Sequence, residues 1–162
     1  MRRVMERLMN FNELGALGSA YADQGKRLVL TNGCFDLLHT GHVRYLQQAR
    51  DLGDALLVAV NSDASVRELK GSDRPLNGEL DRAEVLAALR CVDHVVIFQG
   101  KRVTEVIRHL RPAIYAKGGD YTLETLDPEE RAALEEVGAE IQLLSLVPGR
   151  STTSLLKKAR IE

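Results

Sequence analysis

The chain has 162 residues, of which 44% are hydrophobic and 28% are charged, as is typical of an ordinary globular domain. Its 22 basic and 23 acidic side chains give a formal net charge of −1, so we expect no nucleic-acid partner, although a local pocket for small anions is compatible with this balance. No run of the sequence approaches the ~18 apolar residues of a membrane span, so no membrane partner is expected.

Taken in chain order, residues 1–25 predict a helical lead-in and residues 26–162 a single domain. Short apolar runs predict strands at 27–31, 55–60, 94–98, 113–116 and 140–145. Helical patterns lie between them and at the end of the chain, at 41–53, 81–90, 102–110, 128–138 and 151–160. This alternation predicts an α/β fold: a Rossmann-like parallel sheet of about five strands with helices on both faces.

Three local details of these elements are also predicted. The helix over 41–53 should bury Val43, Leu46, Ala49 and Leu52, which share one face. Residues 70–80 are rich in Gly, Pro, Asn and Asp and predict a loop. The helix that follows this loop should begin with Asp81 as its acidic cap residue.

The two cysteines, Cys34 and Cys91, form neither a disulfide framework nor a CxxC pair. This usage fits a reducing compartment and disfavours a structural zinc site. The N-terminus starts basic but lacks an uninterrupted apolar run, so a secretory signal is not expected. We therefore expect a cytoplasmic protein.

Four polar clusters follow predicted strands: TNGCFDLLHTGH, NSD, KGGD and PGRSTTS. Open parallel sheets bind ligands beyond the carboxyl ends of their strands, near the point where the strand order switches. The clusters should therefore gather at one edge of the sheet. Neither GxGxxG after the first strand nor a Walker A sequence occurs, so phosphate would be bound by another device.

The first cluster contains His39-x-x-His42 at the start of a predicted helix. Metal ligation is disfavoured because no HExxH or cysteine partner completes a site. A structural pair that caps the helix is a second reading. The surrounding glycines favour a third, since Gly33 allows a sharp turn and Gly41 lets a ligand approach the helix N-terminus. Free N–H groups, the helix dipole and two imidazoles there would bind a triphosphate.

The other clusters allow both structural and functional readings. The glycines of KGGD form an ordinary turn or allow close approach of a nucleoside, with Asp120 accepting from ribose or base. Ser151, Thr152 and Thr153 cap a helix, bind phosphate, or do both. Lys70 and Arg82 flank the loop and are either solvated charges or phosphate ligands. Asp36 and Asp63 would hold Mg²⁺ or orient a lysine. Cys34, His94 and His109 are interpreted as structural residues, although Cys34 lies within the TNGCFDLLHTGH cluster.

Together these segments resemble the HxGH nucleotidyltransferase superfamily, through GCFDLLHTGH. The fuller set TNGCFDLLHTGH, AVNSDASVRELKG, LRPAIYAKGGDY and VPGRSTTSLL resembles its adenylyltransferase branch of ADP-heptose synthesis, from about residue 12 to 160. The resemblance implies catalytic roles for His39, His42, Lys70 and Arg82, and an acceptor or metal region at Asp36 and Asp63. It also implies a nucleotide site made of Thr31, Asn32, Gly33, Cys34, Phe35, Asp36, His39, Gly41, His42, Lys117, Gly118, Gly119, Asp120, Ser151, Thr152 and Thr153.

The implied reaction joins D-glycero-β-D-manno-heptose 1-phosphate to the AMP moiety of ATP and releases pyrophosphate. Mg²⁺ would be bound through the triphosphate, with no protein-only metal site. The partners implied are a nucleotide, a phosphorylated sugar, a homo-oligomeric copy of the chain and a separate sugar kinase. Two alternatives stay open: a glycerol-3-phosphate cytidylyltransferase that uses CTP, and a non-catalytic nucleotide-binding module.

Overall fold

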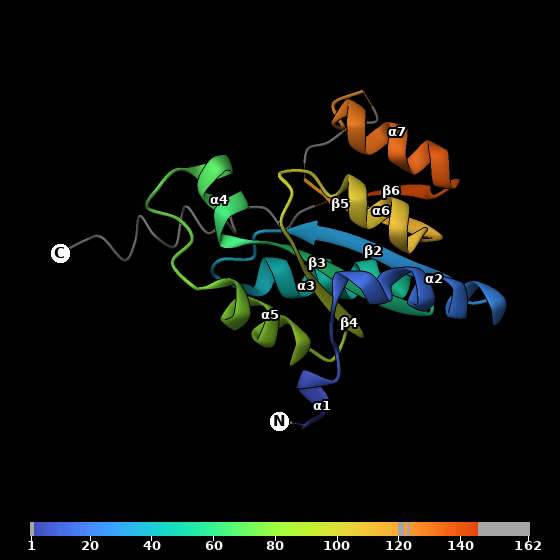
Figure 1. The fold of residues 1–162 in the computed structure, drawn as a ribbon, viewed down its shortest axis with the longest axis horizontal. Helices are drawn as coiled ribbons and strands as arrows, with labels where there is room; N and C mark the ends of the chain where they lie inside the picture. The colour runs from blue at the N-terminus through green and yellow to red at the C-terminus, as the bar shows by residue number, and fades with distance from the viewer. Residues whose placement is uncertain (1, 120–121, 123, 146–162) are drawn as a thin grey trace.

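The computed structural model describes residues 2–119, 122 and 124–145 (Figure 1). Its strands are β1 (Leu8–Met9), β2 (Leu28–Gly33), β3 (Ala55–Asn61), β4 (His94–Phe98), β5 (Ile114–Gly118) and β6 (Glu140–Leu144). Its helices are α1 (Arg2–Met5), the 3₁₀ turn η1 (Phe11–Glu13), α2 (Leu14–Asp23), α3 (Thr40–Asp51), α4 (Asp63–Lys70), α5 (Glu79–Ala87), α6 (Thr104–Leu110) and α7 (Pro128–Val137). The predicted helix over 151–160 lies outside the described residues.

The strands form one parallel sheet in the order β1-β4-β3-β2-β5-β6. The chain therefore proceeds outward from β2 to β4 on one side and then returns to β5 on the other, so that the strand order switches between β2 and β5. Such a switch is where doubly wound sheets bind ligands. The predicted Rossmann-like architecture is confirmed, with six strands in place of about five.

Helices cover both faces of the sheet, and each face has its own apolar core. Residues of α2, α6 and α7 pack with Leu28 and Leu30 on one face. Residues of α3 and α5 pack with Val29 on the other, as the alternation of side chains along a strand requires. Among the described helices, none has the length and apolar character needed to cross a bilayer.

The structure differs from the sequence prediction at three points. The segment predicted as a helical lead-in forms α1 and α2 but also the short strand β1, which pairs with β4 at the sheet edge. Helix α4 was not predicted; its N-cap Ser62 accepts a hydrogen bond from the Ser65 N–H at 3.2 Å. Helix α5 begins at Glu79 with Gly78 as its N-cap, so the prediction of Asp81 as the cap residue was wrong.

One side chain of α3 also differs from the prediction. Val43 is 42% exposed, whereas Tyr45 is buried together with Leu46 and Ala49. The buried face of α3 is therefore rotated toward Tyr45, whose hydroxyl reaches the sheet. Figure 1 shows α4 and the loop after it beyond the carboxyl end of β2. That edge of the sheet carries the candidate site.

Candidate active site

Strands β2 and β5 separate at their carboxyl ends. β2 pairs with β3 along its whole length, from Leu28 to Gly33, whereas its register with β5 covers only Val29 and Leu30. Tyr45 bridges the resulting gap: its hydroxyl lies 2.6 Å from Thr31 Oγ1 and donates to the Ala116 carbonyl at 3.0 Å. Burial raises the pKa of Tyr45 to about 12, so this hydroxyl keeps its proton at neutral pH.

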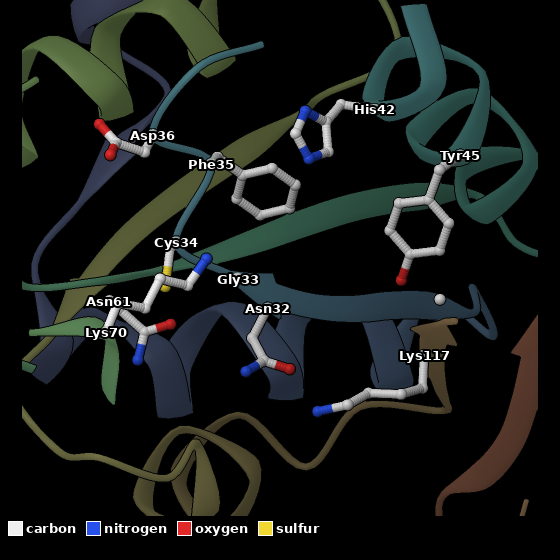
Figure 2. A pocket seen from close by; sticks show the side chains of 11 residues that line it. Asn32, Gly33, Cys34, Phe35, Asp36, His42, Tyr45, Asn61, Lys70 and Lys117 are labelled. Carbon is white, nitrogen blue, oxygen red and sulfur yellow. The ribbon is translucent and has the colours of Figure 1, made fainter. Parts of the chain in front are cut away.

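A cavity of about 270 Å³ opens where the strands separate. The polar clusters at the ends of β2 and β5 both contribute to it, together with the ends of β3 and α4 (Figure 2). Its lining residues are Asn32, Gly33, Cys34, Phe35, Asp36, His42, Tyr45, Asn61, Lys70, Lys117 and Gly118. The cavity thus brings together much of the predicted site, with one lysine from α4 and another from β5.

The two histidines stand at the N-terminus of α3. His39 is the N-cap residue and makes no side-chain capping hydrogen bond. Its ring stacks on the His42 ring with centroids 3.9 Å apart, and His42 packs edge-on against Phe35 at 5.4 Å. Because a helix N-terminus attracts anions, the pair lies where a phosphate would meet both imidazoles and backbone N–H groups.

His42 is neutral in this environment. Burial lowers its pKa to about 4, and the neighbouring His39 and Lys70 lower it in the same direction, against a hydrogen bond with the Leu37 backbone. A neutral imidazole donates one hydrogen bond without carrying a buried charge. A bound polyanion would favour the protonated form, so the ring is suited to respond as negative charge develops.

The turn after β2 shapes the floor of the cavity. Phe35 has a positive φ of 47°, uncommon for a residue other than glycine. Its ring lies so close to Gly33 that a Cβ there would be 2.9 Å from Phe35 Cε2. A Cβ at Gly118 would likewise lie 2.5 Å from Tyr45 Cε2. Both glycines are therefore required by ring packing at the two strand ends.

Arg82 occupies a different place from the one expected. It was expected to hold the nucleotide phosphates, but its side chain is buried and is not part of the cavity wall. Its Nη1 donates to the Cys34 carbonyl at 2.6 Å, and its Nη2 donates to the Asn61 carbonyl and to Asp63 Oδ1, both at 2.8 Å. Its Nε donates to the Asn77 carbonyl at 3.0 Å. Arg82 thus joins the ends of β2 and β3 to the loop before α5.

Asp36 is likewise engaged within the protein. Its buried carboxylate accepts from Arg74 Nε at 2.6 Å and from the backbone N–H groups of Leu76 and Asn77 at 2.9–3.0 Å. Burial would raise the pKa of Asp36, but these hydrogen bonds from Asn77, Leu76 and Arg74 outweigh it and lower the pKa. The side chain therefore fastens the loop over 74–77 to the turn after β2.

The expected acceptor or metal region does not form a paired-carboxylate site. Asp36 is bonded to Arg74, and Asp63 is bonded to Arg82 on another side of the loop. Within residues 2–119, 122 and 124–145, no group of three or more His, Cys, Asp or Glu side chains is placed to hold a metal ion.

At the end of β5, Lys117 and Gly118 line the cavity, and Gly119 follows them in the chain. Lys117 Nζ is bonded to Glu130 Oε2 and to the Tyr115 hydroxyl, both at 3.1 Å. Gly119 has a φ of +133°, a conformation that favours glycine. Asp120, Ser151, Thr152 and Thr153 lie outside the described residues.

Sequence reasoning missed several residues of this region: Tyr45, Asn61, Arg74, Tyr115 and Glu130. Tyr45 lies on the same helix as the histidines, and its polar tip could have signalled a buried hydrogen bond. Asn61 is the first residue of the predicted NSD cluster, but it was not named as a site residue. Nothing local marks Arg74 or Glu130, because their partners are far away along the chain.

Comparisons with known proteins agree with this geometry. The cytidylyltransferase-like family model matches residues 30–157. The chain is 51% identical over 154 residues to the bifunctional protein HldE of Geotalea uraniireducens, and 52% identical over 152 residues to that of Pelobacter propionicus. These matches cover 95% and 94% of this chain but 31% of each relative, so the chain spans about a third of their length.

Two solved structures share the fold. The lipopolysaccharide core biosynthesis protein of Thermoplasma volcanium has a TM-score of 0.63 and 27% identity, over 76% of this chain and 98% of that one. The pantoate-beta-alanine ligase of Francisella tularensis has a TM-score of 0.59 and 12% identity, over 90% of this chain and 68% of the ligase chain. At this identity, the match shows the fold alone. The family match and the parallel sheet with its histidine pair lead to one conclusion: the chain belongs to the cytidylyltransferase-like family of nucleotidyltransferases.

Proposed function

We propose that the protein transfers the AMP moiety of ATP to D-glycero-β-D-manno-heptose 1-phosphate, giving ADP-heptose and pyrophosphate. The observation that carries the nucleotidyl-transfer chemistry is the stacked His39–His42 pair at the uncapped N-terminus of α3, beside a cavity at the switch between β2 and β5. The choice of acceptor is supported by the high identity to the bifunctional HldE proteins.

In the proposed reaction, a phosphate oxygen of the sugar 1-phosphate attacks the α-phosphorus of ATP in line. The new P–O bond forms as the bond from the α-phosphorus to the bridging oxygen breaks, and pyrophosphate leaves with that oxygen. No covalent enzyme intermediate is needed, because positioning and charge stabilisation supply the rate enhancement. The two imidazoles and the N–H groups of α3 stabilise the phosphoryl oxygens, and Lys70 and Lys117 provide positive charge from opposite walls.

Mg²⁺ completes this proposal by neutralising the triphosphate. The arginine-bonded Asp36 and Asp63 favour an ion that travels with the nucleotide over one held by a protein-only site. Arg82 does not contact the substrate in this proposal. It positions the cavity wall by hydrogen bonds to the Cys34 carbonyl and to the loop before α5. The predicted nucleotide roles of Asp120, Ser151, Thr152 and Thr153 remain part of the proposal.

The proposal extends to the setting of the enzyme. A sugar kinase must supply the 1-phosphate acceptor, and the bifunctional relatives, of which this chain matches about a third, are consistent with such a partner activity. We further propose a cytoplasmic homo-oligomer in which residues 1–25 lead into a catalytic domain over 26–162. Light scattering of the purified protein tests the oligomeric part.

The deciding experiment crosses ATP and CTP against heptose 1-phosphate and glycerol 3-phosphate, with Mg²⁺ present, and measures pyrophosphate release. Release only with ATP and the heptose phosphate is the expected result. Release with CTP and glycerol 3-phosphate would replace both substrates while keeping the mechanism. Nucleotide binding without release in any pair would refute the proposed reaction and favour a binding module.

A further inference from the structure

A chain of hydrogen bonds lies along the wall of the cavity at the ends of β2 and β5. It starts at Glu130 on α7, a carboxylate that is only 3% exposed. Glu130 Oε2 accepts from Lys117 Nζ at 3.1 Å, and Lys117 Nζ also donates to the Tyr115 hydroxyl at 3.1 Å. The Tyr115 hydroxyl in turn donates to Asn32 Oδ1 at 2.7 Å. The chain thus runs from a helix on one face of the sheet to the last residues of β2.

The direction and length of these bonds favour one orientation of the Asn32 amide. A lysine ammonium only donates, so the Tyr115 oxygen accepts from Lys117. The Tyr115 hydroxyl hydrogen then has two acceptors within reach, Asn32 Oδ1 at 2.7 Å and Glu130 Oε2 at 3.3 Å, and the shorter bond is the one to Asn32. Asn32 therefore turns its oxygen to Tyr115, which leaves both hydrogens of Nδ2 available. Figure 2 shows the amide oxygen on the side of Lys117 and the nitrogen turned the other way. Within the part of the chain that the structure describes, Asn32 Nδ2 donates no hydrogen bond.

An amide nitrogen presented in this way selects hydrogen-bond acceptors. Asn32 lines the same cavity as His42 and Lys70, where the proposed reaction needs donors for phosphate oxygens. A neutral amide also has no proton to lose near neutral pH, so its donor capacity does not vary there. Without the Tyr115 hydroxyl, the amide could rotate and present its oxygen, which would repel a phosphate.

We infer that Tyr115 is a positioning residue: held by Lys117 and Glu130, it orients the Asn32 amide so that Nδ2 donates to a phosphate oxygen of the bound nucleotide. This inference rests on the proposed function, and it assigns a role to a buried side chain that does not itself form the cavity wall. Tyr115 is 0% exposed, and its ring also belongs to the apolar core. Replacement by phenylalanine removes the hydroxyl and keeps the ring.

A double-mutant cycle tests the inference with Mg-ATP as the probe and calorimetric binding as the readout. Tyr115→Phe and Asn32→Ala should each weaken binding about fivefold, the usual worth of one hydrogen bond. The double variant should bind no more than about twofold more weakly than Asn32→Ala alone, because Tyr115 acts through Asn32. Tyr21→Phe is the matched control, since it removes a hydroxyl bonded to His94 Nε2 at 3.0 Å and should leave binding unchanged.

A second variant covers the case in which Tyr115→Phe fails to fold. Asn32→Asp keeps the acceptor for Tyr115 but replaces the donor by a negative charge, so binding should weaken by more than about tenfold. Additive losses in the cycle, or wild-type affinity in Asn32→Asp, would overturn the inference while ATP binding by the wild type upholds the proposed nucleotide site. No ATP binding by the wild type would overturn the proposed function, and this inference with it.

Discussion

Replacing Arg82 by alanine is expected to destabilise the fold strongly. The substitution leaves the Asp63 carboxylate and three backbone carbonyls without their shared donor. The Asp63 side chain is 29% exposed, so most of the cost comes from the three carbonyls. At about 1 kcal/mol or slightly more for each lost hydrogen bond, they account for roughly 3–4 kcal/mol. For a chain of this length, such a loss lowers the thermal midpoint by roughly 10 °C.

Urea denaturation followed by circular dichroism measures this loss directly. Arg108→Ala is the matched control, because Arg108 also makes two side-chain ion pairs, with Glu105 and Glu136, but is 40% exposed. It should cost far less stability than Arg82→Ala, because ion pairs between exposed side chains contribute little. If Arg82→Ala were as stable as Arg108→Ala but failed to bind Mg-ATP, Arg82 would be a phosphate ligand and the structural role would be refuted.

Three further substitutions or titrations test the site. The His42 ring should titrate in NMR spectra with a midpoint near 4. Because the unfolded chain binds this proton more readily, the free energy of unfolding should fall as the pH drops from 6.5 toward 4. A midpoint near 6.5 would contradict the burial of the ring. The wild type should have a larger unfolding free energy than Asp36→Asn at neutral pH, and this difference should disappear as the pH falls below 3.8. The reason is that Asp36, whose pKa is lowered in the fold, stabilises the fold only while its carboxylate is ionised. A difference that persists in acid would contradict this role. Gly118→Ala should lower stability by about 1–3 kcal/mol, because the added methyl overlaps the Tyr45 ring; unchanged urea unfolding would show that the ring moves freely.

The fold could be predicted from the sequence because its signals are local. Buried parallel strands such as β3 are continuous apolar runs, and the helices between them have a clear period. Strand β1 was missed because two residues, Leu8 and Met9, carry no period of their own and become a strand only by pairing with β4. Helix α4 was also missed, although its N-cap residue, Ser62, is of a type that often begins a helix.

The site was predicted in composition more than in role. Residues next to strand ends, such as His42, Lys70 and Lys117, do line the cavity. Arg82 was expected among them because a single arginine beside a loop gives no sign of burial; its partners are mostly backbone carbonyls that only the folded chain brings together. The bond between Lys117 and Glu130 joins residues of β5 and α7, and no spacing rule predicts it.

The most direct test of the account compares the wild type with His42→Ala for pyrophosphate release from ATP and heptose 1-phosphate under saturating Mg²⁺. His109→Ala serves as the control, since its exposed ring lies on α6 and bonds the Glu105 carbonyl. The account predicts that His42→Ala loses at least about a hundredfold in kcat, as expected for a donor that acts on transition-state charge, while His109→Ala keeps wild-type activity. Wild-type kcat in His42→Ala would contradict the central claim that the stacked pair stabilises nucleotidyl transfer.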